Sequence, residues 1–120
     1  MSKLTIYHYP QCGTCRKAIK DLQAAGHELD LRHIKETPPS SEELAQFIDQ
    51  SGLEVKKFFN TSGEVYKGMG LKDKLPNMSR EEQIKLLASN GMLIKRPIVT
   101  DGESVTVGYK EDQFEQVWGK

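Results

Sequence analysis

Both cysteines of this 120-residue chain lie in the sequence Tyr9-Pro10-Gln11-Cys12-Gly13-Thr14-Cys15-Arg16-Lys17. Residues 3–9, which lead into it, have the strand-favouring composition of Leu4, Ile6 and Tyr7. Residues 14 to about 25, which follow it, carry apolar side chains at helical spacing and end at a glycine. A Cys-x-x-Cys pair between a strand and a helix is typical of a redox dithiol.

The alternation of polar and apolar residues over 28–34 predicts a second strand. Strand, helix and strand then occupy about 32 residues, which is the length of a parallel βαβ unit. We therefore expect residues 3–34 to form two neighbouring parallel strands joined by a helix.

The middle of the chain, about 40–91, predicts a helical insertion. Ser40 and Ser79 are each followed by glutamate three residues later, which is the pattern of a capping box. Two short β-rich runs then flank Asp101-Gly102 and predict a hairpin, and residues 113–118 predict a last amphipathic helix. We expect residues 1–120 to form a single α/β domain, in the order β-α-β, helical insertion, β-β-α.

The composition limits the partners. Lys plus Arg and Asp plus Glu number 17 each, so the chain lacks the basic surplus that non-specific binding to nucleic acid or an anionic membrane needs. No apolar run approaches the roughly 20 residues of a membrane span, and the N-terminus lacks the apolar core of a signal peptide. We expect a cytoplasmic monomer. In the cytoplasm, a close cysteine pair is catalytic, redox-sensing or metal-binding more often than a permanent disulfide.

The spacing of the two cysteines assigns them different roles. Cys12 at the first turn of the helix would face unpaired backbone N–H groups and the positive end of the helix dipole, and both lower a thiol pKa. Cys15 lies one turn further on the same face, with the Cα atoms about 5–6 Å apart, within disulfide range. Gly13 and Thr14 leave Cys12 approachable, and Arg16 adds positive charge nearby. We expect Cys12 to be the nucleophile and Cys15 the resolving thiol.

Two other readings of the cysteine pair stay open. The cysteines could be two small buried hydrophobic residues, although Gly and Thr between them make a poor core pattern. They could also bind zinc with His8, but a structural zinc takes four ligands and these residues supply three. We expect no metal, and no motif for a bound cofactor is present.

Arg96-Pro97 and His8 are further candidates for the site. In domains with a dithiol at the end of the first strand, the residues before the later hairpin approach it. Arg96 could therefore hold an anion or lower the pKa of Cys12, or it could be an ordinary surface arginine. His8, four residues before Cys12, could tune the thiol or be a buried strand residue bonded to the backbone.

Four motifs resemble those of one protein family. They are Ile6-Tyr7-His8-Tyr9-Pro10-Gln11-Cys12-Gly13-Thr14-Cys15-Arg16-Lys17, Pro38-Pro39-Ser40 with Glu43-Leu44, Gly70-Leu71, and Ile94-Lys95-Arg96-Pro97-Ile98-Val99. At these spacings they resemble the ArsC/Spx family of glutaredoxin-coupled arsenate reductases, the transcriptional regulator Spx and their relatives. The resemblance covers essentially the whole chain. It implies a thioredoxin-like (glutaredoxin-like) fold with a helical insertion between the second and third strands, and a cis peptide bond at Pro97.

The resemblance also implies functional roles. Cys12 matches the family's catalytic cysteine, which forms the thiol–arsenate adduct, and His8 and Arg96 match as well. The glutaredoxin-coupled reductases typically have serine in place of Cys15. They hold the oxyanion with two further arginines, where this chain has Asn60 and Val107-Gly108-Tyr109. The implied function is a thiol–disulfide oxidoreductase of the arsenate reductase family, with glutathione and glutaredoxin, or thioredoxin, as electron donor.

The Cys-x-x-Cys pair and the run 107–112 also resemble Spx and its close relatives. Spx binds the C-terminal domain of the RNA polymerase α subunit and uses its dithiol as a switch. Gly52 matches a glycine that Spx uses at that surface, although it fits a helix C-cap equally well. A redox-sensing transcriptional regulator is therefore the alternative function.

Overall fold

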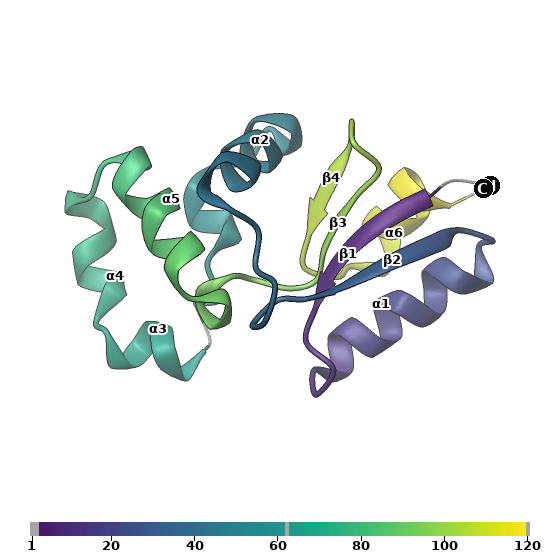
Figure 1. The fold of residues 1–120 in the computed structure, drawn as a ribbon, viewed down its shortest axis with the longest axis horizontal. Coiled ribbons are helices and arrows are strands. Elements are labelled where there is room, and N and C mark those ends of the chain that lie inside the picture. Colours follow the sequence, from purple (N-terminus) through teal and green to yellow (C-terminus); the bar gives the residue numbers. More distant parts are fainter. Residues whose placement is uncertain (1–2, 62, 120) are drawn as a thin grey trace.

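The computed structural model describes residues 3–61 and 63–119, and it centres on a four-stranded sheet of order β2-β1-β3-β4. The strands are β1 (Lys3–His8), β2 (Glu28–His33), β3 (Ile98–Thr100) and β4 (Val105–Val107). β1 pairs with β2 in parallel, while β1 with β3 and β3 with β4 pair antiparallel. Helix α1 (Gly13–Ala24) joins β1 to β2 (Figure 1). The predicted βαβ unit and hairpin are both confirmed.

Alternate residues of the central strand β1 supply two separate cores. Leu4 and Ile6 point to the face covered by α1 and by α6 (Glu111–Trp118), where Phe114 and Trp118 complete the packing. Tyr7 points to the opposite face, which α2 (Ser41–Ser51) covers. The period of two along a strand explains this division, because successive side chains project to opposite faces.

The predicted helical insertion between β2 and β3 is confirmed, with more elements than expected. It contains α2, η1 (Val55–Phe58), α3 (Glu64–Gly68), α4 (Leu71–Lys74), η2 (Leu75–Asn77), α5 (Arg80–Ser89) and η3 (Gly91–Leu93). Both capping boxes are present at Ser40 and Ser79. Sequence patterns did not predict α4 and η2, because elements of three or four residues are too short to show a helical period.

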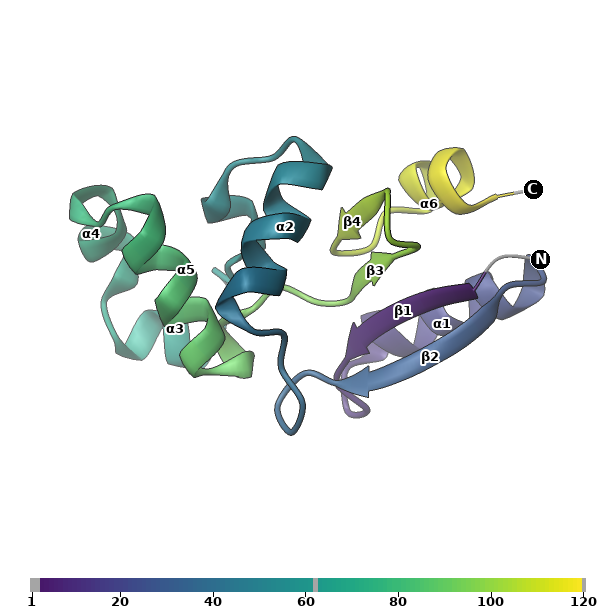
Figure 2. The ribbon, with the colours of Figure 1, turned by 45° about the horizontal axis from the view of Figure 1, so that its top comes forward.

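The inserted helices extend to one side of the sheet, as Figures 1 and 2 show. The chain returns from them along a short antiparallel contact between Phe59 and Ile94, in which the Lys95 N–H donates to the Phe58 carbonyl at 2.7 Å. This segment leads directly to Arg96 and Pro97, which immediately precede β3. Within residues 3–61 and 63–119, no helix is both long and apolar enough to cross a membrane.

Candidate active site

The turn between β1 and α1 places Cys12 at the start of the helix. Cys12 is the N-cap residue, with an extended backbone (φ −86°, ψ 116°). Its N–H donates to the Tyr9 carbonyl at 2.9 Å, and its own carbonyl accepts from the Arg16 N–H at 3.1 Å. Cys12 is partly exposed, whereas Cys15, in the first turn of α1, is fully buried. Both thiols are free, so reagents can approach only one of them directly.

The surroundings separate the pKa values of the two thiols. Burial raises the pKa of Cys12, but hydrogen bonds from the Cys15 backbone and thiol, the charge of Arg96 and the Thr14 N–H together bring it below its usual value. Burial raises the pKa of Cys15 to about 12, and its hydrogen bond to Cys12 acts in the same direction. The backbone N–H of Tyr9 and the charge of Arg96 oppose that rise only in part. Cys12 is therefore the thiol that ionises first.

Arg96 reaches the site from the segment that follows the inserted helices. Its guanidinium carbon lies 5.2 Å from the centroid of the Tyr9 ring. Its Nε and Nη1 atoms are buried and have no hydrogen-bond partner among the described residues. The Arg96–Pro97 peptide bond is cis, as the family resemblance implied. Arg96 thus presents a positive charge at the dithiol with unused hydrogen-bond donors.

The other predicted site residues divide into two groups. Gly13 and Thr14 are exposed in the first turn of α1, Arg16 is exposed one turn later, and Pro97 is buried with its carbonyl accepting from the Gly108 N–H at 2.9 Å. Asn60 is held beside the segment that leads to Arg96, because its N–H donates to the Leu93 carbonyl at 2.7 Å. A place for Asn60 at the thiols remains a prediction.

His8 faces the neighbouring strand. Its ring centroid lies 6.4 Å from that of His33 on β2, and its carbonyl accepts from the Ile34 N–H at 2.8 Å. Burial lowers the pKa of His8, and the nearby His33 lowers it further. A role for His8 in tuning Cys12 remains a prediction.

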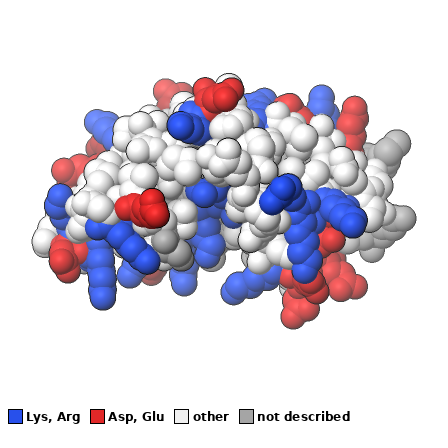
Figure 3. All heavy atoms as spheres, turned by 90° about the horizontal axis from the view of Figure 1, so that it is seen from below, with Lys and Arg blue, Asp and Glu red and all other residues white. Residues whose placement is uncertain are grey.

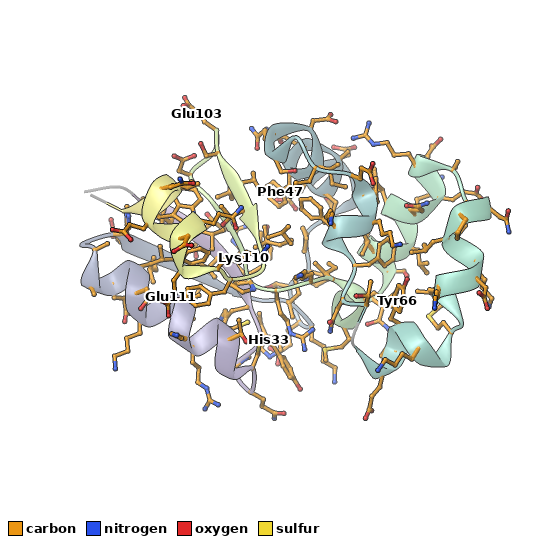
Figure 4. All side chains as sticks on the ribbon, turned by 180° about the vertical axis from the view of Figure 1, so that it is seen from behind. His33, Phe47, Tyr66, Glu103, Lys110 and Glu111 are labelled. Carbon is orange, nitrogen blue, oxygen red and sulfur yellow. The ribbon has the colours of Figure 1, made fainter. Side chains whose placement is uncertain are left out.

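Sequence reasoning missed Tyr9 as a site residue. Its carbonyl holds Cys12, its ring lies beneath Arg96, and the edge-on contact with His33 places the two ring centroids 5.6 Å apart at 88°. His33 lies where the sheet meets the inserted helices (Figure 4). An aromatic residue between the strand and Pro10 was the available signal, but its partner Arg96 is remote in sequence.

The surface around this end of the sheet is rich in positive charge. Figure 3 views the side on which the β1–α1 turn projects, and Lys and Arg side chains are numerous across the middle of that face. Lys56, Lys57 and Lys95 line a hollow of about 350 Å³ between η1 and the segment that leads to Arg96. Among the described residues, no group of three or more His, Cys, Asp or Glu side chains is arranged to hold a metal ion.

Comparisons with known proteins identify one family and several relatives of the chain. The model of the ArsC family matches residues 7–117. The uncharacterized protein YusI of Bacillus subtilis is 62% identical over 115 residues, covering 96% of this chain and 98% of that protein. The arsenate reductase of Escherichia coli K12 is 36% identical over 99 residues (82% of this chain, 69% of that protein). The regulatory protein MgsR of Bacillus subtilis is 30% identical over 112 residues (93% and 87%).

A solved structure also resembles this fold closely. The crystal structure of an ArsC-family-related protein from Bacteroides fragilis has a TM-score of 0.91 and 50% sequence identity, covering 94% of this chain and 95% of that chain. The predicted thioredoxin-like α/β fold with a helical insertion is confirmed.

Proposed function

Because the chain belongs to the ArsC family, we propose that it is a thiol–disulfide oxidoreductase in which Cys12 is the nucleophile and Cys15 the resolving thiol. The observation that carries the proposal is the difference between the two thiols. Cys12 is partly exposed with a lowered pKa, while Cys15 is buried with a pKa raised to about 12. The thiolate is the reactive form of cysteine, so an incoming sulfur meets the ionised and accessible partner first.

The reaction then proceeds in two exchanges. The Cys12 thiolate attacks one sulfur of a disulfide R–S–S–R′, forming the mixed disulfide between Cys12 and R while R′–S⁻ leaves and takes a proton from water. Cys15 loses its proton and attacks the Cys12 sulfur, so that the Cys12–Cys15 disulfide forms and R–S⁻ leaves. Two electrons pass from the dithiol to the substrate. Glutathione with glutaredoxin, or thioredoxin, returns the protein to the dithiol.

The first exchange itself prepares the second. The negative charge on Cys12 and the hydrogen bond to it both raise the pKa of Cys15 in the reduced protein. Burial, the largest cause of the raised pKa of Cys15, persists in the mixed disulfide, but the charge on Cys12 is then gone. Cys15 therefore gives up its proton more readily after the first exchange than before it.

The absence of arginine at two positions where the family's arsenate reductases have it favours a disulfide over arsenate as substrate. Each charge-assisted hydrogen bond to an oxyanion contributes about 1.5–3 kcal/mol. Arg96 supplies such donors, while Asn60 carries no charge and the run 107–109 contains no arginine. A neutral disulfide needs no such set of cations, so we expect disulfide exchange to be faster than arsenate reduction.

The test compares the two substrates side by side. Reduced protein is mixed with a glutathionylated peptide or with arsenate, and loss of the two thiols is followed by mass spectrometry. Turnover is then measured with glutaredoxin or thioredoxin. Cys12→Ser should abolish the reaction, while Cys15→Ser should accumulate the mixed disulfide on Cys12. If Cys12→Ser retains turnover, the proposal is wrong.

One observation favours a second function, that of a redox-sensing regulator. Gly52 caps α2 in the left-handed conformation (φ 71°), which confirms the helix-cap reading, yet it also lines an exposed hollow of about 580 Å³ with Leu53 and Arg80. The relative MgsR is a regulatory protein, and the Spx-like reading assigns this surface to the RNA polymerase α subunit. Binding of the isolated α C-terminal domain to reduced and oxidised protein tests it, and absence of binding in both states excludes it.

A further inference from the structure

Tyr9 connects Arg96 to the dithiol through its ring and its main chain. The guanidinium carbon of Arg96 lies 5.2 Å from the ring centroid, inside the roughly 6 Å within which a cation is attracted to an aromatic face. The Tyr9 carbonyl accepts from the Cys12 N–H at 2.9 Å, and the Tyr9 backbone N–H acts to lower the pKa of Cys15. The residue that fixes the turn around both thiols therefore also contacts the nearby cation.

The orientation of the Tyr9 ring is itself supported by β2. His33 packs edge-on against it, with the ring planes at 88°. The His33 Nδ1 atom accepts from the N–H groups of Lys35 and Glu36 at 3.1 and 3.2 Å. These bonds hold the His33 ring in place, so the Tyr9 ring rests against a fixed neighbour.

Arg96 lacks the usual means of fixing an arginine. Its buried Nε and Nη1 atoms donate to no acceptor among the described residues. The packing around these buried atoms therefore supplies no hydrogen bond that fixes the direction of the guanidinium. The cation–π contact with the face of the Tyr9 ring is a directional contact that the structure does provide.

We propose that Tyr9 is a positioning residue whose ring holds the Arg96 guanidinium beside Cys12, so that the positive charge acts on the Cys12 sulfur. The inference rests on the proposed function only in taking Cys12 as the reacting thiol. The effect of Tyr9 on the Cys12 sulfur passes through Arg96. The lowered pKa of Cys12, to which the Arg96 charge contributes, is consistent with this role.

The test measures alkylation of Cys12 by iodoacetamide as a function of pH, which needs neither a disulfide nor turnover. Tyr9→Leu removes the aromatic face and should shift the pH profile of alkylation to higher pH. We expect alkylation at pH 7 to slow by about two- to thirtyfold, which is the change in an equilibrium that the free energy of a cation–π contact corresponds to. Tyr9→Phe keeps the face and should retain the original profile. Tyr109→Leu is the matched control, because it removes another tyrosine under a cation, Lys17 at 5.5 Å.

A double-mutant cycle separates positioning from general disruption. In the Arg96→Met background, Tyr9→Leu should produce no further shift of the profile. The inference is overturned if Tyr9→Leu reproduces the wild-type profile, or if it shifts the profile equally with and without Arg96. Circular dichroism checks folding, and Tyr9→Met serves as a second variant if Tyr9→Leu does not fold. Failure of Cys12 in turnover would reject the proposed function while leaving this alkylation test valid.

Discussion

Gly91 packs directly against the main-chain carbonyl of Ile34. A Cβ built on Gly91 would lie 1.9 Å from that oxygen and 2.7 Å from its carbon. The contact joins the end of the helical insertion to Ile34, the residue that follows β2. It is a close approach of two backbones, which only a residue without a side chain allows.

Replacing Gly91 should therefore destabilise the protein. Gly91→Ala forces one backbone segment to move, and we expect a loss of about 1–3 kcal/mol in the free energy of unfolding. Urea denaturation followed by circular dichroism measures it. Gly68→Ala is the control, because a Cβ on this glycine in α3 meets nothing within 4 Å. Equal stabilities of the two variants would contradict the close contact.

Alkylation should distinguish the two cysteines sharply. Because the pKa of Cys12 lies below and that of Cys15 above the usual value, the thiolate of Cys12 persists to lower pH than that of a free cysteine. We expect iodoacetamide at pH 7 to label Cys12 and leave Cys15 unmodified in the folded protein. Peptide mass spectrometry checks this, with urea-unfolded protein as the control in which both should react. Equal labelling of the two in the folded state would rule out the proposed roles.

Removing the charge of Arg96 should slow the same reaction. Its guanidinium favours the Cys12 thiolate, so Arg96→Met should raise the pKa of Cys12 and lower the alkylation rate at pH 7 severalfold. At a pH well above the thiol pKa, the two rates should converge, since the thiolate is then fully formed. Arg80→Met is the matched control, because Arg80 pairs with Asp49 in the insertion. A loss of rate that persists at high pH would point to a structural defect instead.

The last helix should depend on a buried hydrogen bond. Trp118 Nε1 donates to Thr106 Oγ1 at 3.0 Å, and both residues are buried. Trp118→Phe leaves the threonine hydroxyl without this donor, which we expect to cost about 1–3 kcal/mol of stability. Thr106→Val leaves the indole N–H unpaired and should cost a similar amount. Combining the two should cost less than the sum, and an additive result in urea denaturation would show that the bond contributes nothing.

Local features of the fold could be predicted because they depend on short-range chemistry. The capping boxes at Ser40 and Ser79 bond residues only three apart. The Asp101-Gly102 turn is likewise stabilised by local hydrogen bonds, because the Asp101 carboxylate accepts from the Glu103 and Ser104 N–H groups. The dithiol at the strand–helix junction is of the same kind, since Cys12 and Cys15 share one turn of α1.

The composition of the site outside that turn depended on tertiary structure. The sequence singled out His8 by its spacing from Cys12 and Asn60 by the family resemblance, and their roles stay predictions. The structure adds contacts that no local pattern predicts, because the Asn60 N–H bonds to the Leu93 carbonyl and the His8 ring faces His33. The sequence offered no reason to select Tyr9, whose importance comes from a cation contributed by the opposite end of the chain.

The sequence by itself therefore determined where the two thiols lie and that Cys12 begins a helix, because backbone propensity and hydrogen bonds act over a few residues. Only the tertiary structure decided which distant charge meets them. The antiparallel pairing of β3 with β1 brings Arg96 to Tyr9 and Cys12. Strand pairing and core packing, which a local pattern does not encode, set that contact and also the burial of Cys15 that raises its pKa.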